Sequence, residues 1–449
     1  MRYTAVLVAL VALVALMLAV GFVGADVSIP DELPMGLTID YWHEWDGAQA
    51  DAITQIIDAF NMDNEWGITV EQVYQGNTGG LIDQLSTGIV SGELPNLSGA
   101  VFANNAMGYY LDGVLVPLDA YLEHPVWGFD DMGMDNLNHS LLAINRVPFE
   151  PFNDQLLAWP VGMSANVLSV NLGMLEGLGH DGPPTDMASF REVACAANEL
   201  TGPAGEDVQG FPLRTNDNDM YSFIVANGGY IYDDMGYNFT NEKALEVLQF
   251  FQDLYADGCA YIPDGPYVNT ADFAFGLNPM AVGSSVGVPF IRADIEASGS
   301  DINWVNTTVP WGGENRTLQV YQRSMGMYVS SPEEQLATWL FLKHLASPAS
   351  QVLWTEYAQY QPYTRAGLEG LSEEFLTANP QFNSIREVLL DDSTILWSEP
   401  VLVGSDRVGP VFQELIANVT TGGMDVMEAA AAAEAEANEI IAEAMEDMG

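Results

Sequence analysis

LTIDYWHEWDGAQADAITQIIDAFNMDNEWGITVEQVYQGNTGGLIDQLSTGIV, residues 37–90, contains two strand–helix units in succession. Apolar residues alternate with polar ones over 37–42, the period of a half-buried strand. Residues 53–60 place isoleucines and a phenylalanine at i, i+3, i+4 and i+7, one buried face of a helix. A β-branched run over 68–74, a Gly-Asn-Thr-Gly-Gly turn and helix-spaced apolar residues over 81–89 repeat the unit. This order predicts an α/β fold built on a parallel sheet.

The remainder of the chain continues in the same style. Residues 167–170 read as a strand, and residues 190–197 and 247–254 read as amphipathic helices. The C-terminal third is mostly helical, and its alanine- and glutamate-rich end, 424–448, favours a terminal helix packed on a lobe. At 449 residues the chain is longer than one hydrophobic core usually supports. We therefore expect two lobes.

The charge balance is strongly acidic. Twelve lysines and arginines against 62 aspartates and glutamates give a net charge of −50. Such a field repels nucleic acid and anionic lipid, so neither is expected as a partner. An acidic, lysine-poor surface suits a high-salt habitat, where screening weakens its self-repulsion. The competing interpretation is an acidic extracellular protein from an ordinary habitat, and the dependence of stability on salt separates the two.

The first 25 residues have the pattern of a signal peptide. Arg2 precedes an apolar run over 5–23, and small residues lead to a predicted cut after Ala25. The run is also long enough for an uncleaved membrane anchor, which stays open as the alternative. Residues 26–35 are then a polar, proline-containing tether. In both interpretations the protein is extracellular or periplasmic.

The two cysteines, Cys195 and Cys259, are predicted to form a disulfide. An even pair in an oxidising compartment favours a bridge, and both cysteines lie on or beside predicted helices. Two unrelated buried thiols are the alternative.

Few catalytic motifs can be sought in the sequence with success. It contains no P-loop and no H-E-x-x-H, and its five histidines lack metal-ligand spacing. Adjacent acids such as 130–131 and 391–392 could serve a secreted glycosidase, but in a chain with 62 acids such pairs arise by accident. We expect no enzymatic activity, no metal and no cofactor.

Trp42 and Trp45 bracket the end of the first predicted strand. Sugars stack their C–H faces on aromatic rings, and in a parallel α/β sheet ligands bind at the carboxyl ends of the strands. These two residues therefore favour a sugar site, with core packing as the alternative.

Seven segments, in chain order, resemble the family 1 extracellular solute-binding proteins of ABC importers, which include maltose- and glycerol-3-phosphate-binding proteins. The segments are IDYWHEW with its following helix and FN, LIDQLSTGIVSGELPNL, LVPLDAYL, WPVGMSANVLSVNLGMLEGLG, GPPTDMASFREVACAANEL, FAFGLNPMAVGSSVGVPF and WLFLKHLASPASQVLWTEYAQYQPYTRAG. They cover nearly the whole chain after the tether.

The resemblance implies a two-lobed, type II periplasmic-binding-protein-like α/β fold with a hinge of crossover segments. It implies a monomer that closes on a small ligand and then docks on the permease subunits of an ABC transporter. On this basis the lobes are predicted to divide as 36–162 and 286–325 for lobe I, and 163–285 and 326–449 for lobe II.

The resemblance also implies ligand-binding residues at matching positions, and two more, Tyr221 and Trp311, come from their loop positions alone. The predicted set is Trp42, Trp45, Asn77, Asn104, Ser164, Asn166, Tyr221, Ser284, Ser285, Trp311, Arg323 and Tyr360. Glycerol-3-phosphate binders of the family place an arginine late in the chain, where this sequence has Leu402. Loss of a bidentate phosphate partner favours a neutral sugar or oligosaccharide.

Arg323 leaves a second possibility open. It stands in a stretch that is usually small and glycine-rich in the family, and it could contact a carboxylate-bearing sugar or form a structural ion pair. A glycerol-phosphate or anionic-sugar binder is therefore the first alternative, and a secreted carbohydrate-active enzyme is the alternative from another class.

Overall fold

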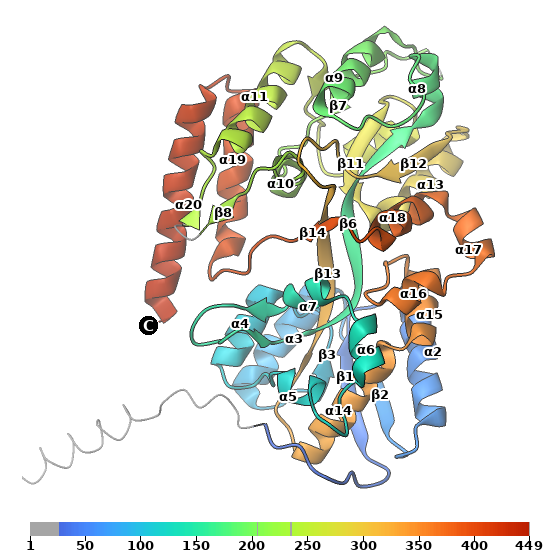
Figure 1. Ribbon diagram of the computed structural model, residues 1–449, viewed down its shortest axis with the longest axis vertical. Helices are drawn as coiled ribbons and strands as arrows, with labels where there is room; N and C mark the ends of the chain where they lie inside the picture. Colours follow the sequence, from blue (N-terminus) through green and yellow to red (C-terminus); the bar gives the residue numbers. More distant parts are fainter. Residues whose placement is uncertain (1–26, 204, 234–235, 449) are drawn as a thin grey trace, which may run out of the picture.

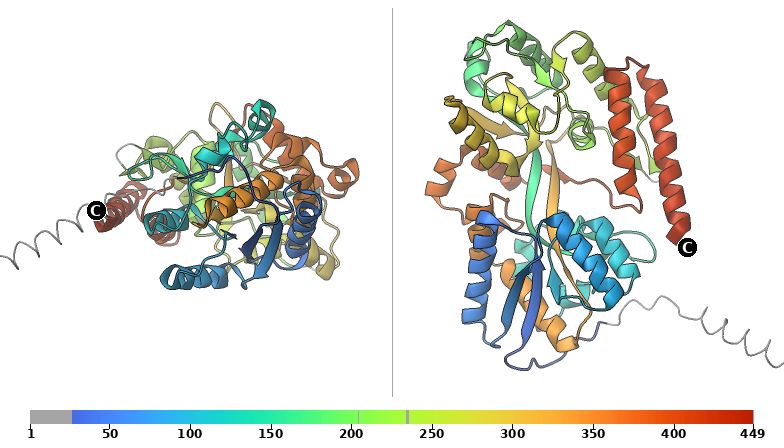
Figure 2. Two further views of the ribbon diagram at one scale, coloured as in Figure 1. Left: turned by 90° about the horizontal axis from the view of Figure 1, so that it is seen from below. Right: turned by 180° about the vertical axis from the view of Figure 1, so that it is seen from behind.

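Two long antiparallel strands, β6 (Trp159–Asn171) and β13 (Thr317–Met327), run through the centre of the molecule and join its two lobes (Figures 1 and 2). The computed structural model describes residues 27–203, 205–233 and 236–448. All 13 residues of β6 are buried, because the strand is covered on both faces along its length. The main sheet has the order β11-β6-β13-β3-β1-β2, with β12 paired to β6 and β14 to β13.

Lobe I contains the two strand–helix units that the sequence predicts. β1 (Thr38–His43) pairs in parallel with β2 (Thr69–Tyr74) and with β3 (Leu97–Ser98). The remaining elements of this lobe are α2 (Gly47–Asp63), α3 (Thr78–Ser91), α4 (Ala103–Leu111), α5 (Asp119–Leu122), α6 (Asp131–Asn136), α7 (His139–Ala143), β4 (Arg146–Val147), β5 (Gln155–Leu156), α14 (Pro332–Leu345), α15 (Pro348–Ala358), α16 (Arg365–Glu369), α17 (Glu373–Ala378) and α18 (Pro380–Leu390).

Lobe II is built around the second half of β6. β11 (Met280–Ser284) and β12 (Trp304–Thr307) both pair antiparallel with it. The other elements are α8 (Leu172–Gly177), α9 (Met187–Ala196), η1 (Ala197–Glu199), β7 (Phe211–Pro212), α10 (Asp217–Ala226), β8 (Tyr232–Asp233), β9 (Gly236–Tyr237), α11 (Glu242–Ala256), β10 (Ala260–Tyr261), α12 (Val268–Ala274), η2 (Ser285–Gly287), α13 (Val288–Ser298), β14 (Ile395–Trp397), η3 (Ser405–Arg407), α19 (Val408–Thr420) and α20 (Val426–Met448).

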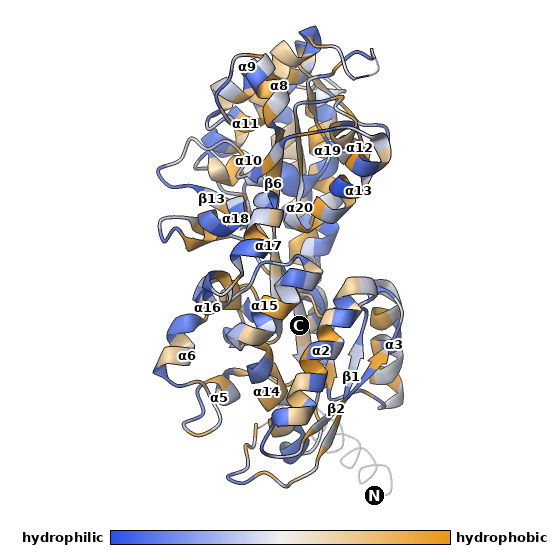
Figure 3. Cartoon of the chain, turned by 90° about the vertical axis from the view of Figure 1, so that its right-hand side faces the viewer, coloured by the Kyte–Doolittle hydropathy of each residue, from blue (hydrophilic) through white to orange (hydrophobic). Residues whose placement is uncertain are grey.

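Hydrophobic periodicity explains why the helices pack as they do. α2 buries Ile53, Ile56, Ile57 and Phe60 in the lobe I core, the residues that share one face at helical spacing. α14 begins at a capping box on Ser331, whose side chain accepts from the N–H of the third helical residue. Figure 3 shows helices of both lobes with hydrophobic and hydrophilic residues on different sides.

The predicted division of the chain between the lobes is wrong in the second half. β12 pairs with the lobe II end of β6, so the chain stays in lobe II after residue 285 and returns only along β13. α14 and α15 then pack in the same core as β1 and α2, which puts them in lobe I. The chain passes back to lobe II after β14, and α19 and α20 pack there. β11, in the segment FAFGLNPMAVGSSVGVPF, does not cross between the lobes but is a strand of lobe II that pairs with β6.

Helix α18 ties the lobes together beside the hinge strands. Its Ile385 and Val388 pack in the lobe I core. On its other side, Gln381 donates a hydrogen bond to the Trp304 oxygen at 2.9 Å and Ser384 donates one to the Asn306 oxygen at 2.6 Å, both on β12 of lobe II. The chain therefore connects the lobes at β6, at β13 and at the segment from α18 to η3.

The two ends of the chain differ in how far the structure covers them. The predicted signal peptide, 1–25, lies outside the described residues. The predicted tether does not hang free, because Val27, Ile29 and Leu33 pack against lobe I and Trp127 donates to the Pro30 oxygen at 2.9 Å. The predicted terminal helix is α20, which packs on lobe II. No helix among the described residues has the length and apolar character needed to cross a membrane.

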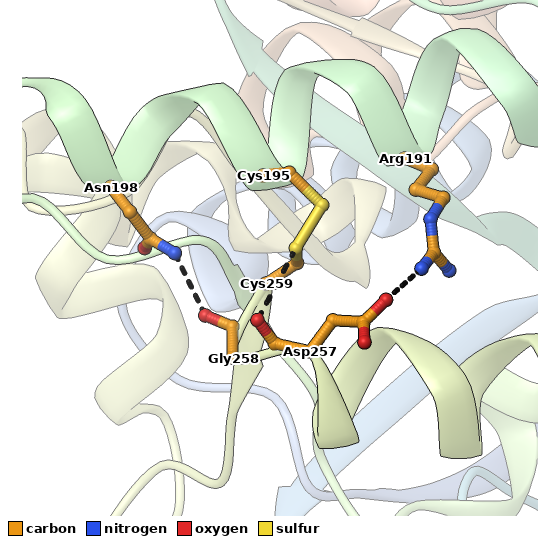
Figure 4. Close-up of a disulfide and its surroundings, with 6 residues drawn as sticks. All are labelled: Arg191, Cys195, Asn198, Asp257, Gly258 and Cys259. Atoms are coloured by element: carbon orange, nitrogen blue, oxygen red, sulfur yellow. Dashed lines mark hydrogen bonds and ion pairs between the residues drawn. A yellow bond between two sulfur atoms is a disulfide. The ribbon is translucent and has the colours of Figure 1, made fainter.

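The predicted disulfide is present and joins Cys195 of α9 to Cys259, directly before β10, with the Cα atoms 4.4 Å apart (Figure 4). Two further contacts flank it. Arg191 forms an ion pair with Asp257, and Asn198 donates to the Gly258 oxygen at 2.8 Å. α9, which carries Cys195, lies at the end of lobe II that is remote from lobe I (Figure 1).

Candidate functional site

The residues that directly follow β1, β2 and β3 meet at one side chain of the hinge, Arg323 of β13. Its guanidinium Nη1 donates to Thr78 Oγ1 at 2.8 Å and lies 3.6 Å from Glu44 Oε1. The guanidinium carbon lies 5.9 Å from the ring centre of Trp45 and 5.5 Å from that of Phe102. We call this group the Arg323 cluster; it consists of Glu44, Trp45, Thr78, Phe102, Arg323 and Tyr360.

Tyr360 connects this cluster to an aromatic wall. Its ring packs against Trp45 and Trp354, and Trp45 and Trp354 contact edge-on with ring centres 4.9 Å apart. Burial raises the pKa of Tyr360, and the neighbouring Arg323 opposes the rise by its charge and a hydrogen bond. Gly162 of β6 leaves room for the wall, because a Cβ there would lie 2.8 Å from Trp354 Nε1.

Lobe II contributes a second polar group, at the amino end of α10. Arg214 donates two hydrogen bonds to Asp219, from Nε to Oδ2 at 2.7 Å and from Nη2 to Oδ1 at 2.5 Å. Asn166 of β6 donates to Ser222 Oγ at 2.8 Å, and Ser222 in turn donates to Gln319 of β13. We call this group the Asp219 cluster; it consists of Asn166, Arg214, Asn218, Asp219, Ser222 and Gln319.

Acidic side chains gather beside the Asp219 cluster. Burial raises the pKa of Asp219, although Arg214 opposes the rise. Burial and the charge of Asp217 raise the pKa of Glu399 to about 8. Tyr321 of β13 lies among these groups, and burial followed by the charges of Asp219, Asp217 and Glu399 raises its pKa. The hinge strands thus carry polar side chains toward both lobes, with Arg323 on the lobe I side and Tyr321 on the lobe II side.

The lobes also contact each other directly at η3. Asn104 of α4 and Ser405 share a hydrogen bond of 3.3 Å across the two lobes. In the segment before η3, Val401 and Val403 pack on lobe I, while Leu402 packs in the lobe II core. Because these side chains alternate between the two cores, the connecting segment from α18 to η3 contacts both lobes.

Within residues 27–203, 205–233 and 236–448, no group of three histidine, cysteine or acidic side chains is disposed to hold a metal ion. Two surface hollows lie elsewhere, one between α11 and the start of α20 and the other between α6, α16 and α18. Neither includes a member of the Arg323 or Asp219 cluster, so we do not assign ligand binding to them.

Comparison with protein families gives a match over residues 55–383 to the bacterial extracellular solute-binding proteins. The match covers most of the chain and runs through both lobes. The chain belongs to this family. The resemblance inferred from the sequence is thereby confirmed, and no match is found among curated protein sequences.

Solved structures of similar architecture include sugar-binding proteins of ABC transporters and related solute-binding proteins, at low identity. The cyclic α-maltosyl-1,6-maltose binding protein of Arthrobacter globiformis superposes with a TM-score of 0.74 at 18% identity, covering 90% of this chain and 99% of the other. The sugar-binding protein MalE of Xanthomonas citri gives 0.74 at 17%, covering 90% and 98%. UgpB of Mycobacterium tuberculosis, in complex with glycerophosphocholine, gives 0.70 at 17%, covering 90% and 98%. They establish the predicted two-lobed α/β fold for this family member.

Of the predicted ligand-binding residues, the structure brings together Trp45, Arg323 and Tyr360. Trp42, on the other face of β1, packs against the second core of lobe I with Leu81 and Leu85. The roles of Trp42, Trp45, Arg323 and Tyr360 in ligand binding stay predictions.

Other predicted residues have structural partners. Asn77 caps α3 by accepting from the Gly80 N–H at 3.0 Å, and Ser285 Oγ accepts from the Ala165 N–H at 3.0 Å. Ser164 is buried on β6 opposite Tyr321, and Ser284 is exposed at the end of β11.

The two residues predicted from loop positions lie apart from the Arg323 cluster. Tyr221 is buried, with its ring 4.5 Å from that of Phe412. Trp311 lies beside Arg316, whose guanidinium carbon is 4.7 Å from its ring centre. Both pack with the lobe II core.

Sequence reasoning missed Glu44, Thr78 and Phe102 of the Arg323 cluster, and Arg214 and Asp219 of the other cluster. A signal existed for Glu44, which stands between the two tryptophans that were singled out. The five-residue spacing of Arg214 and Asp219 does not predict that they pair, because their ion pair depends on the path by which the preceding loop enters α10.

Proposed function

We propose that this protein is the non-enzymatic substrate-binding component of an ABC importer and that it binds a sugar or oligosaccharide between its lobes. The observation that carries the proposal is the Arg323 cluster, where aromatic rings and polar groups from three strand ends meet a hinge strand. Rings and hydroxyl partners in one place suit a sugar, which has apolar faces and polar edges. The sugar ligands named for the A. globiformis and X. citri proteins support the same class.

Export and transport complete the proposal. The basic, apolar and small-residue pattern of residues 1–25 supports secretion, and the strongly acidic surface argues against a nucleic-acid partner. The protein acts as a monomer that delivers its ligand to separate permease subunits. Asn77, Asn104, Asn166 and the serines of β6 and β11 remain the further candidates for contacts in the cleft.

A glycerol-phosphate or anionic-sugar ligand is the second candidate. It is favoured by the partial exposure of Arg323, whose side chain is 30% accessible, and by the phosphodiester ligand named for UgpB. The two candidates differ in the charge of the ligand, so one ligand panel separates them.

A thermal-shift screen of mono- and oligosaccharides in high-salt buffer tests the proposal. A ligand present at about 100 times its Kd adds about 2.7 kcal/mol to the free energy of unfolding, which raises the melting temperature measurably. We expect neutral sugars to produce this rise without any release of hydrolysis products. A broad panel without a shift, or release of shorter sugars on incubation, would contradict the proposal.

Phe102→Ala locates the site. Phe102 is partly exposed and its ring faces Arg323, so its loss should weaken sugar binding by roughly tenfold, the value of one aromatic stacking contact. Phe290→Ala on α13 is the matched control, because that ring is 74% exposed and lies in lobe II. Equal affinities for both variants would remove Phe102 from the site.

A further inference from the structure

Arg323 is held in place by the fold. β13 shifts register against β6 between Arg323 and Ser324, an irregularity of the kind that re-aims a side chain. Thr78 accepts a hydrogen bond from its guanidinium, and the rings of Trp45 and Phe102 lie near that group. The charge of Arg323 is therefore fixed at the junction of the lobes.

Glu44 is the ionic partner of this arginine, and it is almost completely buried. Its side chain is 4% exposed, and its Oε1 lies 3.6 Å from Arg323 Nη1. Neither oxygen has a hydrogen bond of normal geometry to a described residue. Burial raises the pKa of Glu44, and the backbone N–H groups of Glu44 and Ala100 and the charge of Arg323 oppose the rise. A buried carboxylate with so few partners depends on a nearby positive charge to stay ionised.

The same arrangement recurs on the other side of the hinge. Arg214 holds Asp219 through two hydrogen bonds, and Asp219 is 6% exposed. Asp217 adds further negative charge there. Both arginines beside the hinge strands are thus matched by buried acids, so an anionic ligand would meet carboxylates next to each guanidinium.

We propose that the Glu44–Arg323 pair sets the charge selectivity of the binding site: Glu44 neutralises Arg323, so that the site accepts neutral polyhydroxy ligands and rejects carboxylated and phosphorylated ones. The inference rests on the proposed function, since it assigns the ligand class of the same site. It makes Arg323 a donor of hydrogen bonds to hydroxyl groups, and it makes Glu44 the residue that prevents capture of an anion.

The test compares wild type with Glu44→Gln by calorimetric titration in about 1 M NaCl, where charges outside the site are screened. The probes are maltotriose, glucose, glucuronate and sn-glycerol 3-phosphate. Glutamine keeps the shape of the side chain but leaves Arg323 unmatched. We expect the affinity for glucuronate or for sn-glycerol 3-phosphate to rise by roughly tenfold or more, with a smaller change for the neutral sugars.

Glu71→Gln is the matched control, because Glu71 is exposed on β2 in the same lobe and its loss changes the net charge equally. A gain in anion affinity in Glu44→Gln that is missing in Glu71→Gln supports the role of the Glu44–Arg323 pair. It would do so even if no neutral sugar bound, and the lack of sugar binding would then count only against the proposed function. Equal anion affinities in wild type and Glu44→Gln would overturn the inference.

Titration of wild type and Arg323→Gln tests the inference independently, in case Glu44→Gln does not fold. If wild type binds glucuronate or sn-glycerol 3-phosphate at least as tightly as the neutral sugars, and Arg323→Gln abolishes that binding, Arg323 is an anion receptor and the inference is wrong. Under the inference, wild type discriminates against both anions, and Arg323→Gln does not improve their binding.

Discussion

Glu399 holds a proton in the folded state that an ordinary glutamate would release. Burial and the neighbouring Asp217 raise the pKa of Glu399 to about 8. The folded protein therefore binds more protons than the unfolded chain between the ordinary glutamate range and pH 8, and stability falls as the pH rises through that window. We expect Glu399→Gln to be more stable than wild type at pH 7.5 by about 2 kcal/mol, allowing for partial solvent access, and to differ little at pH 4.5.

Urea unfolding at fixed salt measures this difference at both pH values. Glu314→Gln is the control, since Glu314 is exposed and its substitution removes the same charge. If the difference in the free energy of unfolding between Glu399→Gln and wild type were the same at both pH values, Glu399 would be ionised in the folded protein.

Individual residues were predictable where the residue type itself carries the signal. Trp45 and Tyr360 are large aromatic side chains at a strand end and in a helix-pair motif, and Arg323 is a charge in a stretch that is usually small and glycine-rich in the family. Glu44 and Asp219 are acids in a chain with 62 of them, so nothing in the sequence distinguishes the buried acids from the solvated ones. Only the fold shows which acids lie beside an arginine.

At the scale of elements, the disulfide fixes α9 to the start of β10. The bridge closes a separation of 64 residues, so its loss should lower the free energy of unfolding by about 4 kcal/mol in the chain-entropy model. We expect the Cys195→Ser/Cys259→Ser double variant to unfold at lower urea concentration. Sugar affinity should stay unchanged, because α9, which carries Cys195, lies at the end of lobe II away from lobe I (Figure 1).

Reduction of wild type gives an independent comparison. Dithiothreitol should bring the wild-type transition to that of the double variant and leave the variant unaffected. A stability difference that persists under reducing conditions would mean that the serines disturb packing instead.

Elements were predictable where hydrophobic periodicity is strong, and the assignment of elements to lobes was not. The isoleucines of α2 show a buried face in any fold, and β1 and β2 follow from alternation. β11 and β13 both lie in extended, largely buried segments, however, and periodicity does not say which one crosses between lobes. The length of β13 and its pairing with β6, β3 and β14 decide this, and those contacts are long-range.

At the scale of the whole molecule, each lobe is assembled from segments that are distant in the sequence. Lobe I combines the first strand–helix units with α14 and α15, and lobe II combines the middle of the chain with α19 and α20. Three connections between two separate cores permit relative motion about β6 and β13 while each core stays intact. The Arg323 and Asp219 clusters lie on these hinge strands, so a ligand held between them would be coupled to that motion.

The net charge of −50 makes the stability of the whole molecule depend on salt. Self-repulsion among surface acids is long-ranged at about 0.1 M salt, where the Debye length is about 10 Å, and is largely screened at about 1 M, where it is about 3 Å. We expect the urea midpoint to rise steeply over this range and to level off above it. Sucrose is the control, because it stabilises by exclusion from the surface without screening charge. If sucrose and sodium chloride raised the midpoint equally, or salt had no effect, the acidic surface would not reflect a high-salt habitat, and an ordinary extracellular setting would explain the composition instead.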